Sequence, residues 1–215
     1  METWPIGVFA SLDAGLGVKW DVIAELGLPT IQLHAPHPDK RNAETAVQLK
    51  KQLDDMNVVC TAVFGGFEGE SYADIPTVAR TIGLVPQATR ESRLAEMRDI
   101  ADFTKELGCD TVALHLGFIP EDPSDPQYMQ VVAATAALCD HCAANDQYLH
   151  LETGQESAEG LMEFMAKVGS ERLRINFDPA NMILYAKGDP VDALAKLASR
   201  TSQVHIKDAK DTDTP

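Results

Sequence analysis

Apolar and polar residues alternate most clearly between residues 148 and 210, where three short segments share one design. The segments are Tyr148–Glu152, residues 174–178 and residues 203–207. In each of them apolar side chains take every second position, which is typical of a β-strand whose successive side chains point to opposite faces. Glu152, Asp178 and His205 fall on the polar face, near the carboxyl ends of consecutive strands. We therefore expect two carboxylates and one imidazole to lie together.

The same periodicities extend the prediction over the rest of the chain. Further strands are predicted at residues 6–10, 30–34, 58–64 and 111–115. Helices are predicted at residues 18–26, 43–56, 90–107 and 126–144, and after the capping residues Ser157 and Asp189. Strands that alternate with helices indicate a parallel α/β sheet.

The parallel sheet could form a doubly wound fold or a barrel. A doubly wound sheet has helices on both faces, whereas a barrel has helices outside only and accepts polar side chains at its mouth. Polar residues share one face of the last four predicted strands, which favours a (β/α)8 TIM barrel. We predict one such domain over residues 1–215, with seven strands visible and the eighth strand missing from this chain.

Residues 65–89 form a long predicted connection that is rich in Gly, Pro and Ser. Loops of this length in compact domains are often active-site lids. A merely decorative insertion explains the composition equally well, so both interpretations stay open.

The three polar residues at the strand ends also have simpler explanations. A carboxylate in this position often caps a helix, and a strand histidine is often a hydrogen-bonded core residue. All three at matching ends of neighbouring strands are harder to explain in that way. Oxygen and imidazole ligands suit divalent ions, so the pattern predicts a metal site.

Three motifs in this region resemble those of the sugar-phosphate isomerase/epimerase family, the xylose-isomerase-like TIM barrels. They are Leu-Glu-Thr-Gly-Gln-Glu (151–156), Phe-Asp-Pro-Ala-Asn (177–181) and Val-His-Ile-Lys-Asp (204–208). The resemblance implies one divalent ion, Mn, Co, Mg or Zn, held by Glu, Asp, His and a final Glu from four strands. Glu152, Asp178 and His205 match the first three ligands.

The fourth ligand has no counterpart in a strand context. The only carboxylates after His205 are those of residues 208, 211 and 213, in a polar segment without a strand pattern. We therefore expect the natural protein to continue for roughly 40–70 residues, judged from the usual size of the barrel. The chain alone should then be a poor epimerase, because the missing Glu should serve the second face of the substrate carbon.

By the resemblance, the substrate is a ketose or ketose phosphate and the reaction is isomerisation or 3-epimerisation. Glu152 would serve as both metal ligand and general base, because a metal-polarised carbonyl makes the adjacent carbon acidic. The predicted substrate-binding residues are His115, Gln155, Glu156, Asn181 and Lys207. For His115 a structural hydrogen bond is an equal alternative, and for Lys207 and Glu156 the alternative is a solvated charge at the barrel mouth.

Three other functions remain open. A lyase or dehydratase acting on a polyol or cyclic keto-acid could use the same metal and base. An AP-endonuclease-like DNA repair enzyme shares the barrel but needs three metals and further His ligands, and Asn181 stands where such nucleases carry a His. The chain could also be an inactive fragment that binds metal or sugar.

Charge and composition limit the kinds of partner that the chain is expected to bind. The chain has 215 residues, 18 Lys plus Arg against 33 Asp plus Glu, and a formal net charge of −15, which repels phosphate backbones and anionic membranes. It contains no long apolar run, and residues 1–17 carry no Lys or Arg, so neither a membrane span nor a signal peptide is predicted. We expect a cytoplasmic enzyme with a small sugar substrate, without nucleic-acid or membrane partners, and leave a homo-oligomer open.

Overall fold

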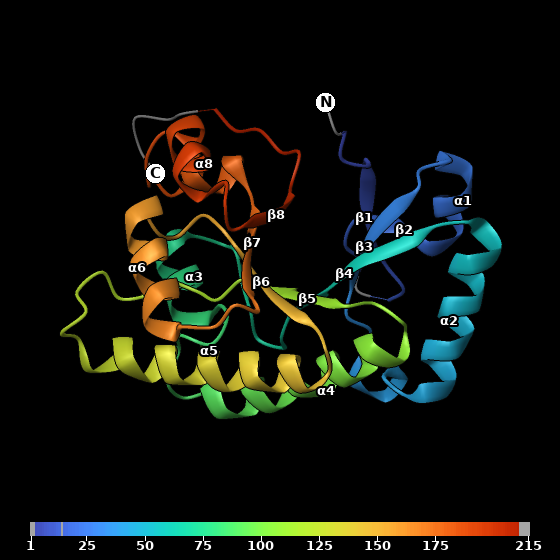
Figure 1. The fold of residues 1–215 in the computed structure, drawn as a ribbon, viewed down its shortest axis with the longest axis horizontal. Coiled ribbons are helices and arrows are strands. Elements are labelled where there is room, and N and C mark those ends of the chain that lie inside the picture. The colour runs from blue at the N-terminus through green and yellow to red at the C-terminus, as the bar shows by residue number, and fades with distance from the viewer. Residues whose placement is uncertain (1–2, 14, 211–215) are drawn as a thin grey trace.

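A single curled sheet of parallel strands organises the structure, a computed structural model that describes residues 3–13 and 15–210 (Figure 1). Residues 211–215, where no strand is predicted, lie outside the described part. The strands are β1 (Gly7–Ser11), β2 (Val18–Lys19), β3 (Thr30–His34), β4 (Val59–Gly65), β5 (Thr111–Leu114), β6 (Tyr148–Glu152), β7 (Leu173–Phe177) and β8 (Thr201–Val204). Their order in the sheet is β2-β1-β3-β4-β5-β6-β7-β8, and every pair is parallel.

Helices cover the outer face of this sheet, as expected for a barrel (Figure 1). They are α1 (Ile23–Leu26), α2 (Ala43–Met56), α3 (Ile75–Thr81), α4 (Arg90–Glu106), α5 (Pro126–Ala144), α6 (Ala158–Val168), α7 (Pro179–Leu184) and α8 (Pro190–Leu197), with 3-10 turns at Trp20–Val22 and Pro38–Lys40. The main core lies between sheet and helices, where Leu33, Val112 and Ile175 are fully buried. The predicted α/β barrel class is confirmed.

The first helix is shorter than the sequence predicts. Residues 18–26 were expected to be helical, but Val18 and Lys19 form β2 by pairing with Ala10 and Ser11 of β1, and α1 begins only at Ile23. Backbone pairing with the neighbouring strand overrides the local helical pattern here. The seven expected strands are all present, and β2 adds a two-residue eighth strand at one edge. Within the described residues the sheet is open between β2 and β8.

The long connection after β4 contains a helix that the prediction missed. Asp74 caps α3, because its Oδ1 accepts a hydrogen bond from the Thr77 N–H at 2.7 Å. Arg93 then fixes the end of the connection by donating to the backbone oxygens of Thr81 and Gly83, at 2.6 and 2.8 Å. The helix α3 has only seven residues, about two turns, so it gave only a weak periodic signal.

A second missed helix, α7, starts directly after β7. Asp178 is its cap, because Oδ1 accepts from the Asn181 N–H at 3.0 Å, and Pro179 takes the first helical position. The helix-capping explanation for Asp178 is therefore correct. The cap uses only one carboxylate oxygen, and the second oxygen contacts other residues.

The described residues contain no helix that combines the length and apolar character needed to cross a bilayer.

We predict that Gly83→Ala destabilises the protein more than Gly108→Ala. Both glycines have positive φ, +70° and +81°, so either alanine should incur left-handed strain on the order of 1–2 kcal/mol. At Gly83 a Cβ would also overlap the backbone oxygen of Leu116, whereas at Gly108 it would meet only the flexible Lys50 side chain. Urea unfolding should show the difference, and equal losses in the two variants would contradict it.

Candidate metal centre

Glu152, Asp178 and His205 meet at the carboxyl ends of three neighbouring strands. Glu152 is the last residue of β6, while Asp178 and His205 directly follow β7 and β8. The His205 N–H donates to the Phe177 carbonyl at 2.8 Å, which continues the β7–β8 pairing up to the site. One ligand atom of each residue lies within 4.8 Å of the others. The structure thus brings together the three residues that the sequence places on one face.

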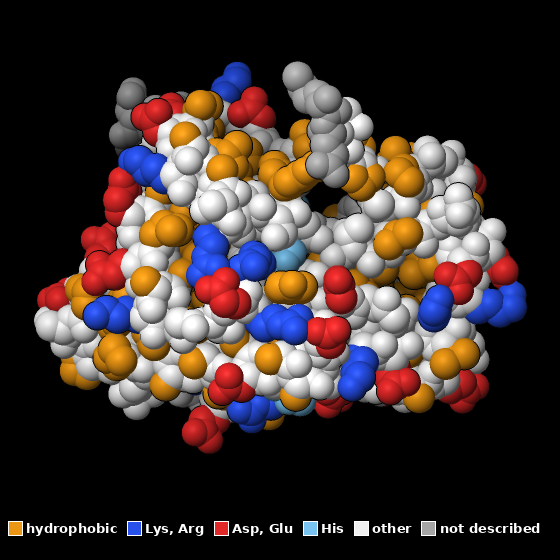
Figure 2. All heavy atoms as spheres, viewed as in Figure 1, with side chains coloured by type: hydrophobic (Ala, Val, Ile, Leu, Met, Phe, Trp, Pro, Cys, Tyr) orange, Lys and Arg blue, Asp and Glu red, His pale blue; other side chains and the backbone are white. Residues whose placement is uncertain are grey.

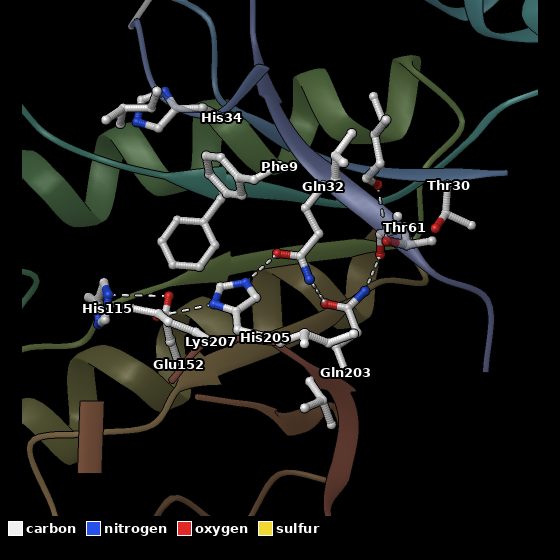
Figure 3. A pocket seen from close by; sticks show the side chains of 18 of the residues that line it. Phe9, Thr30, Gln32, His34, Thr61, His115, Glu152, Gln203, His205 and Lys207 are labelled. Carbon is white, nitrogen blue, oxygen red and sulfur yellow. Dashed lines mark hydrogen bonds and ion pairs between the residues drawn. The ribbon is translucent and has the colours of Figure 1, made fainter. Parts of the chain in front are cut away.

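The Glu152 carboxylate is buried and has a different partner on each oxygen. Oε1 accepts from Asn181 Nδ2 at 3.0 Å and lies 3.2 Å from His205 Nδ1. Oε2 lies 3.2 Å from His115 Nε2 (Figure 3). His115 and Asn181, both predicted as substrate contacts, are therefore in direct contact with the proposed base.

Asp178 is fully buried and reaches the same cluster through its second oxygen. Oδ2 accepts from Lys207 Nζ at 3.0 Å and lies 3.7 Å from His205 Nδ1. The Lys207 ammonium also donates to Asn181 Oδ1 at 2.8 Å. Lys207 is thus directed into the cluster, whereas the sequence left open whether it is a solvated charge.

Charge compensation sets the ionisation of this cluster. Burial raises the pKa of the Glu152 carboxyl, but His115 and His205 outweigh burial and hold that pKa well below its ordinary value. Burial lowers the pKa of His205, but hydrogen bonds to Asp178 and Glu152 outweigh it and raise the pKa to about 9. Glu152 is therefore an ionised carboxylate at neutral pH, as a general base must be.

A cavity of about 980 Å³ opens between β1 and β8 and reaches this cluster. Figure 2 shows the hollow, with hydrophobic side chains around its opening. Glu152, His115, His205 and Lys207 line it on the polar side. Two aromatic rings of the cavity lining pack against these histidines. Phe64 lies 6.2 Å from the His205 ring and Tyr72 lies 5.9 Å from the His115 ring, between centroids.

The start of the connection after β4 contributes to this cavity. Gly66, Glu70 and Tyr72 line it together with Glu152. Parts of residues 65–89 therefore lie at the carboxyl end of the barrel, where a lid is expected.

Gln155 and Glu156 lie in the loop after β6 and are not among the residues that line the cavity. The Glu156 carboxylate accepts from the Ile119 N–H at 3.2 Å, and burial raises its pKa to about 7. Gln155 is buried, and its carboxamide nitrogen has no hydrogen-bond partner among the described residues. Their roles as substrate contacts stay predictions.

Several residues at the cavity were not singled out from the sequence. Gln32 and His34 lie on the inner face of β3, and Phe9 reaches the cavity from β1 (Figure 3). The signal was present, because Gln32 and His34 alternate with the apolar Ile31 and Leu33. This alternation alone does not connect β3 with a site formed by strands much later in the sequence.

We predict that His205 and His150 titrate at opposite extremes in protein treated with a chelator. His205 should keep its proton up to about pH 9, whereas burial lowers the pKa of His150 to about 4, so that ring should be neutral above this pH. Because the folded pKa of His205 exceeds the ordinary value of 6.5, its contribution to stability is complete below pH 6.5 and is lost as pH rises through 9. Histidine NMR signals followed against pH measure both values, and two midpoints near 6.5 would contradict the structure.

Comparison with known proteins identifies the fold family. Residues 20–215 match the family described as xylose isomerase-like TIM barrel, and no curated protein matches the chain. A solved xylose isomerase domain protein from Planctomyces limnophilus is 53% identical, with a TM-score of 0.94, over 96% of this chain and 73% of that one.

More distant solved structures share the fold alone. A D-psicose 3-epimerase solved with D-fructose has a TM-score of 0.67 at 17% identity, over 85% of this chain and 64% of that one. A probable 3-DHS dehydratase from Bacillus anthracis has a TM-score of 0.68 at 16% identity, over 93% and 72%. From the match over residues 20–215, the chain belongs to the xylose isomerase-like TIM barrel family.

Proposed function

We propose that this protein is a divalent-metal-dependent isomerase or 3-epimerase of a small ketose or ketose phosphate. The observation that carries the proposal is the convergence of Glu152, Asp178 and His205 within one cluster at the cavity. Active sites of TIM-barrel enzymes lie at this carboxyl end of the strands. The similarity of fold to a sugar epimerase supports the substrate class.

The residues of the cluster fit a divalent ion. Two carboxylates and one imidazole form a mixed oxygen and nitrogen donor set that suits Mn²⁺, Co²⁺, Mg²⁺ or Zn²⁺. Both carboxylates are buried and are balanced by His115, His205 and Lys207, and a divalent ion would take over part of this balance. Glu152, Asp178 and His205 would hold the ion, which when bound would polarise a substrate carbonyl and acidify the adjacent carbon.

The two oxygens of Glu152 have separate tasks in this proposal. Oε1 faces His205 and Asn181, so it is the oxygen on the ligand side. Oε2 faces His115 at the cavity and is therefore the atom placed to take the substrate proton. The contact with His115 at 3.2 Å would orient Oε2 before the proton is transferred.

The other residues at the cavity bind substrate and exclude water. Lys207 would exchange part of its contact with Asp178 and Asn181 for an anionic substrate oxygen, because its side chain is only half-buried. Phe9 and Phe64 form an apolar wall beside His205, which limits the access of water to the reacting carbon.

A metal-dependent lyase or dehydratase is the second candidate. The fold it shares with a probable 3-DHS dehydratase favours this alternative. The same abstraction of a proton by Glu152 would then be followed by loss of a neighbouring hydroxyl. Product analysis separates the two, since a dehydratase yields an unsaturated product and an isomerase or epimerase does not.

We predict that Glu152→Gln lowers turnover by at least about 10², because the amide cannot accept the proton as a base. Wild-type protein should lose activity on a ketose panel when a chelator removes metal and regain it with Mn²⁺. Glu159→Gln, which changes an exposed carboxylate paired with Lys196, is the matched control and should behave as wild type.

Assays with a cyclic keto-acid and with abasic-site DNA, beside the ketose panel, test the competing classes. If Glu152→Gln turned over substrate at the wild-type rate with metal present, the result would contradict this mechanism. Release of water from a cyclic keto-acid would assign the dehydratase, and cleavage of abasic-site DNA would assign the nuclease, which the net charge of −15 disfavours.

A further inference from the structure

We propose that Gln32 is a positioning residue that fixes the tautomer and orientation of His205, so that Nδ1 is the nitrogen offered to a metal ion. This inference rests on the proposed function, because it assigns a role toward the same ion. Gln32 lies on β3, on the opposite side of the barrel interior from β8 (Figure 3). It belongs to none of the three motifs that indicated the metal site.

The contact between the two side chains sets the position of the imidazole proton. Gln32 Oε1 lies 2.7 Å from His205 Nε2. A carboxamide oxygen only accepts hydrogen bonds, so Nε2 must carry the proton. In the neutral ring, Nδ1 then keeps a lone pair, and Nδ1 is the nitrogen that faces Glu152 Oε1 at 3.2 Å and Asp178 Oδ2 at 3.7 Å.

A backbone carbonyl fixes which end of the Gln32 amide faces His205. The Thr61 carbonyl oxygen accepts from Gln203 Nε2 at 2.7 Å, so the Gln203 oxygen must point the other way. That oxygen accepts from Gln32 Nε2 at 3.1 Å, which leaves Gln32 Oε1 directed at His205. The direction of donors and acceptors is thus set from the main chain through two amides, as the dashed lines in Figure 3 show.

His150 supports the same orientation of the Gln203 carboxamide. Its Nδ1 lies 3.2 Å from Gln203 Oε1. The His150 ring is buried, and because a carboxamide oxygen only accepts hydrogen bonds, the donor in this contact is the His150 Nδ1–H. Two donors therefore converge on Gln203 Oε1, which disfavours a flipped amide.

Asn176 offers the one competing arrangement. Its Nδ2 lies 3.0 Å from His205 Nε2 and 3.4 Å from Gln32 Oε1. If Nε2 accepted from Asn176, two unprotonated acceptors, Nε2 and Gln32 Oε1, would face each other at 2.7 Å and repel. Donation from Asn176 to Gln32 Oε1 avoids this conflict and leaves Nε2 protonated.

A metal-binding histidine commonly donates its second N–H to an acceptor that fixes the ring, and loss of such an acceptor typically costs 10–100-fold in metal affinity. Gln32 supplies this acceptor here. A preorganised ring avoids the cost of selecting one tautomer and one orientation when the ion binds.

The test compares Gln32→Leu, which removes the acceptor, with Gln32→Glu, which keeps an acceptor oxygen on a side chain of the same length. Calorimetry with Mn²⁺ and Zn²⁺ should show affinity about 10–100-fold weaker for Gln32→Leu and closer to wild type for Gln32→Glu. Long-range ¹H–¹⁵N spectra of the Zn²⁺-loaded protein should show a protonated Nε2 at His205 in wild type and in Gln32→Glu. In Gln32→Leu this signal should weaken or shift to Nδ1.

A second variant separates a specific effect on His205 from general misfolding. Gln203→Leu breaks the link to Thr61 without touching His205, and it should weaken metal binding in the same direction with an unchanged circular dichroism spectrum. Equal metal affinity and an unchanged Nε2 signal in Gln32→Leu would overturn the inference. Wild type that binds metal but converts no sugar would remove only the proposed function, and wild type that binds none of these metals would contradict both.

Discussion

The parallel pairing of β6, β7 and β8 is the constraint on which the site depends. Parallel strands end at the same edge of a sheet, and their side chains alternate between two faces with a fixed period. Glu152 pairs with Asn176, and the Phe177 carbonyl receives the His205 N–H. This register places two carboxylates and one imidazole side by side, at the last position of β6 and directly after β7 and β8. A shift by one residue in any strand would turn its ligand into the helix-facing core.

Burial of the two carboxylates makes the cluster an electrostatic unit. Glu152 and Asp178 are almost inaccessible to water, so their charges must be balanced by neighbours. His115, His205 and Lys207 supply the balance, and this explains why Glu152 stays ionised in spite of burial. Asp178 also caps α7, which ties the helix to the site and positions Asn181 against Glu152. One carboxylate thus has a structural role and a candidate chemical role, because its two oxygens have different partners.

Polar side chains in the barrel interior connect strands that are distant in sequence. Gln32 and Gln203 are 171 residues apart, and their contact links β3 with β8 across the interior. Buried amides are costly unless their hydrogen bonds are made, so each member constrains the next. Such a network gives direction to the imidazole of His205, while the aromatic rings of Phe9 and Phe64 limit its movement.

The sequence by itself determined most of the elements and the composition of the triad. Strand alternation is a local property, so it assigned Glu152, Asp178 and His205 to one face before any contact was known. The helix after Asn42 was predicted with its observed bounds, because its apolar residues recur at helical spacing. In the structure Asn57 ends it in a left-handed conformation. Local signals failed where pairing decided the structure, as at β2, and where a helix was too short to show a period, as at α3.

Only the tertiary structure decided which polar groups meet. The curl of the sheet brings β3 close to β8. Periodicity in the sequence does not predict this approach, because it describes each strand separately. The contacts of Gln32 with His205 and of Lys207 with Asp178 therefore became visible only in the structure. The two-residue alternation of a strand fixes the face on which a side chain lies. The residue that this side chain contacts depends on how strongly the whole sheet curls.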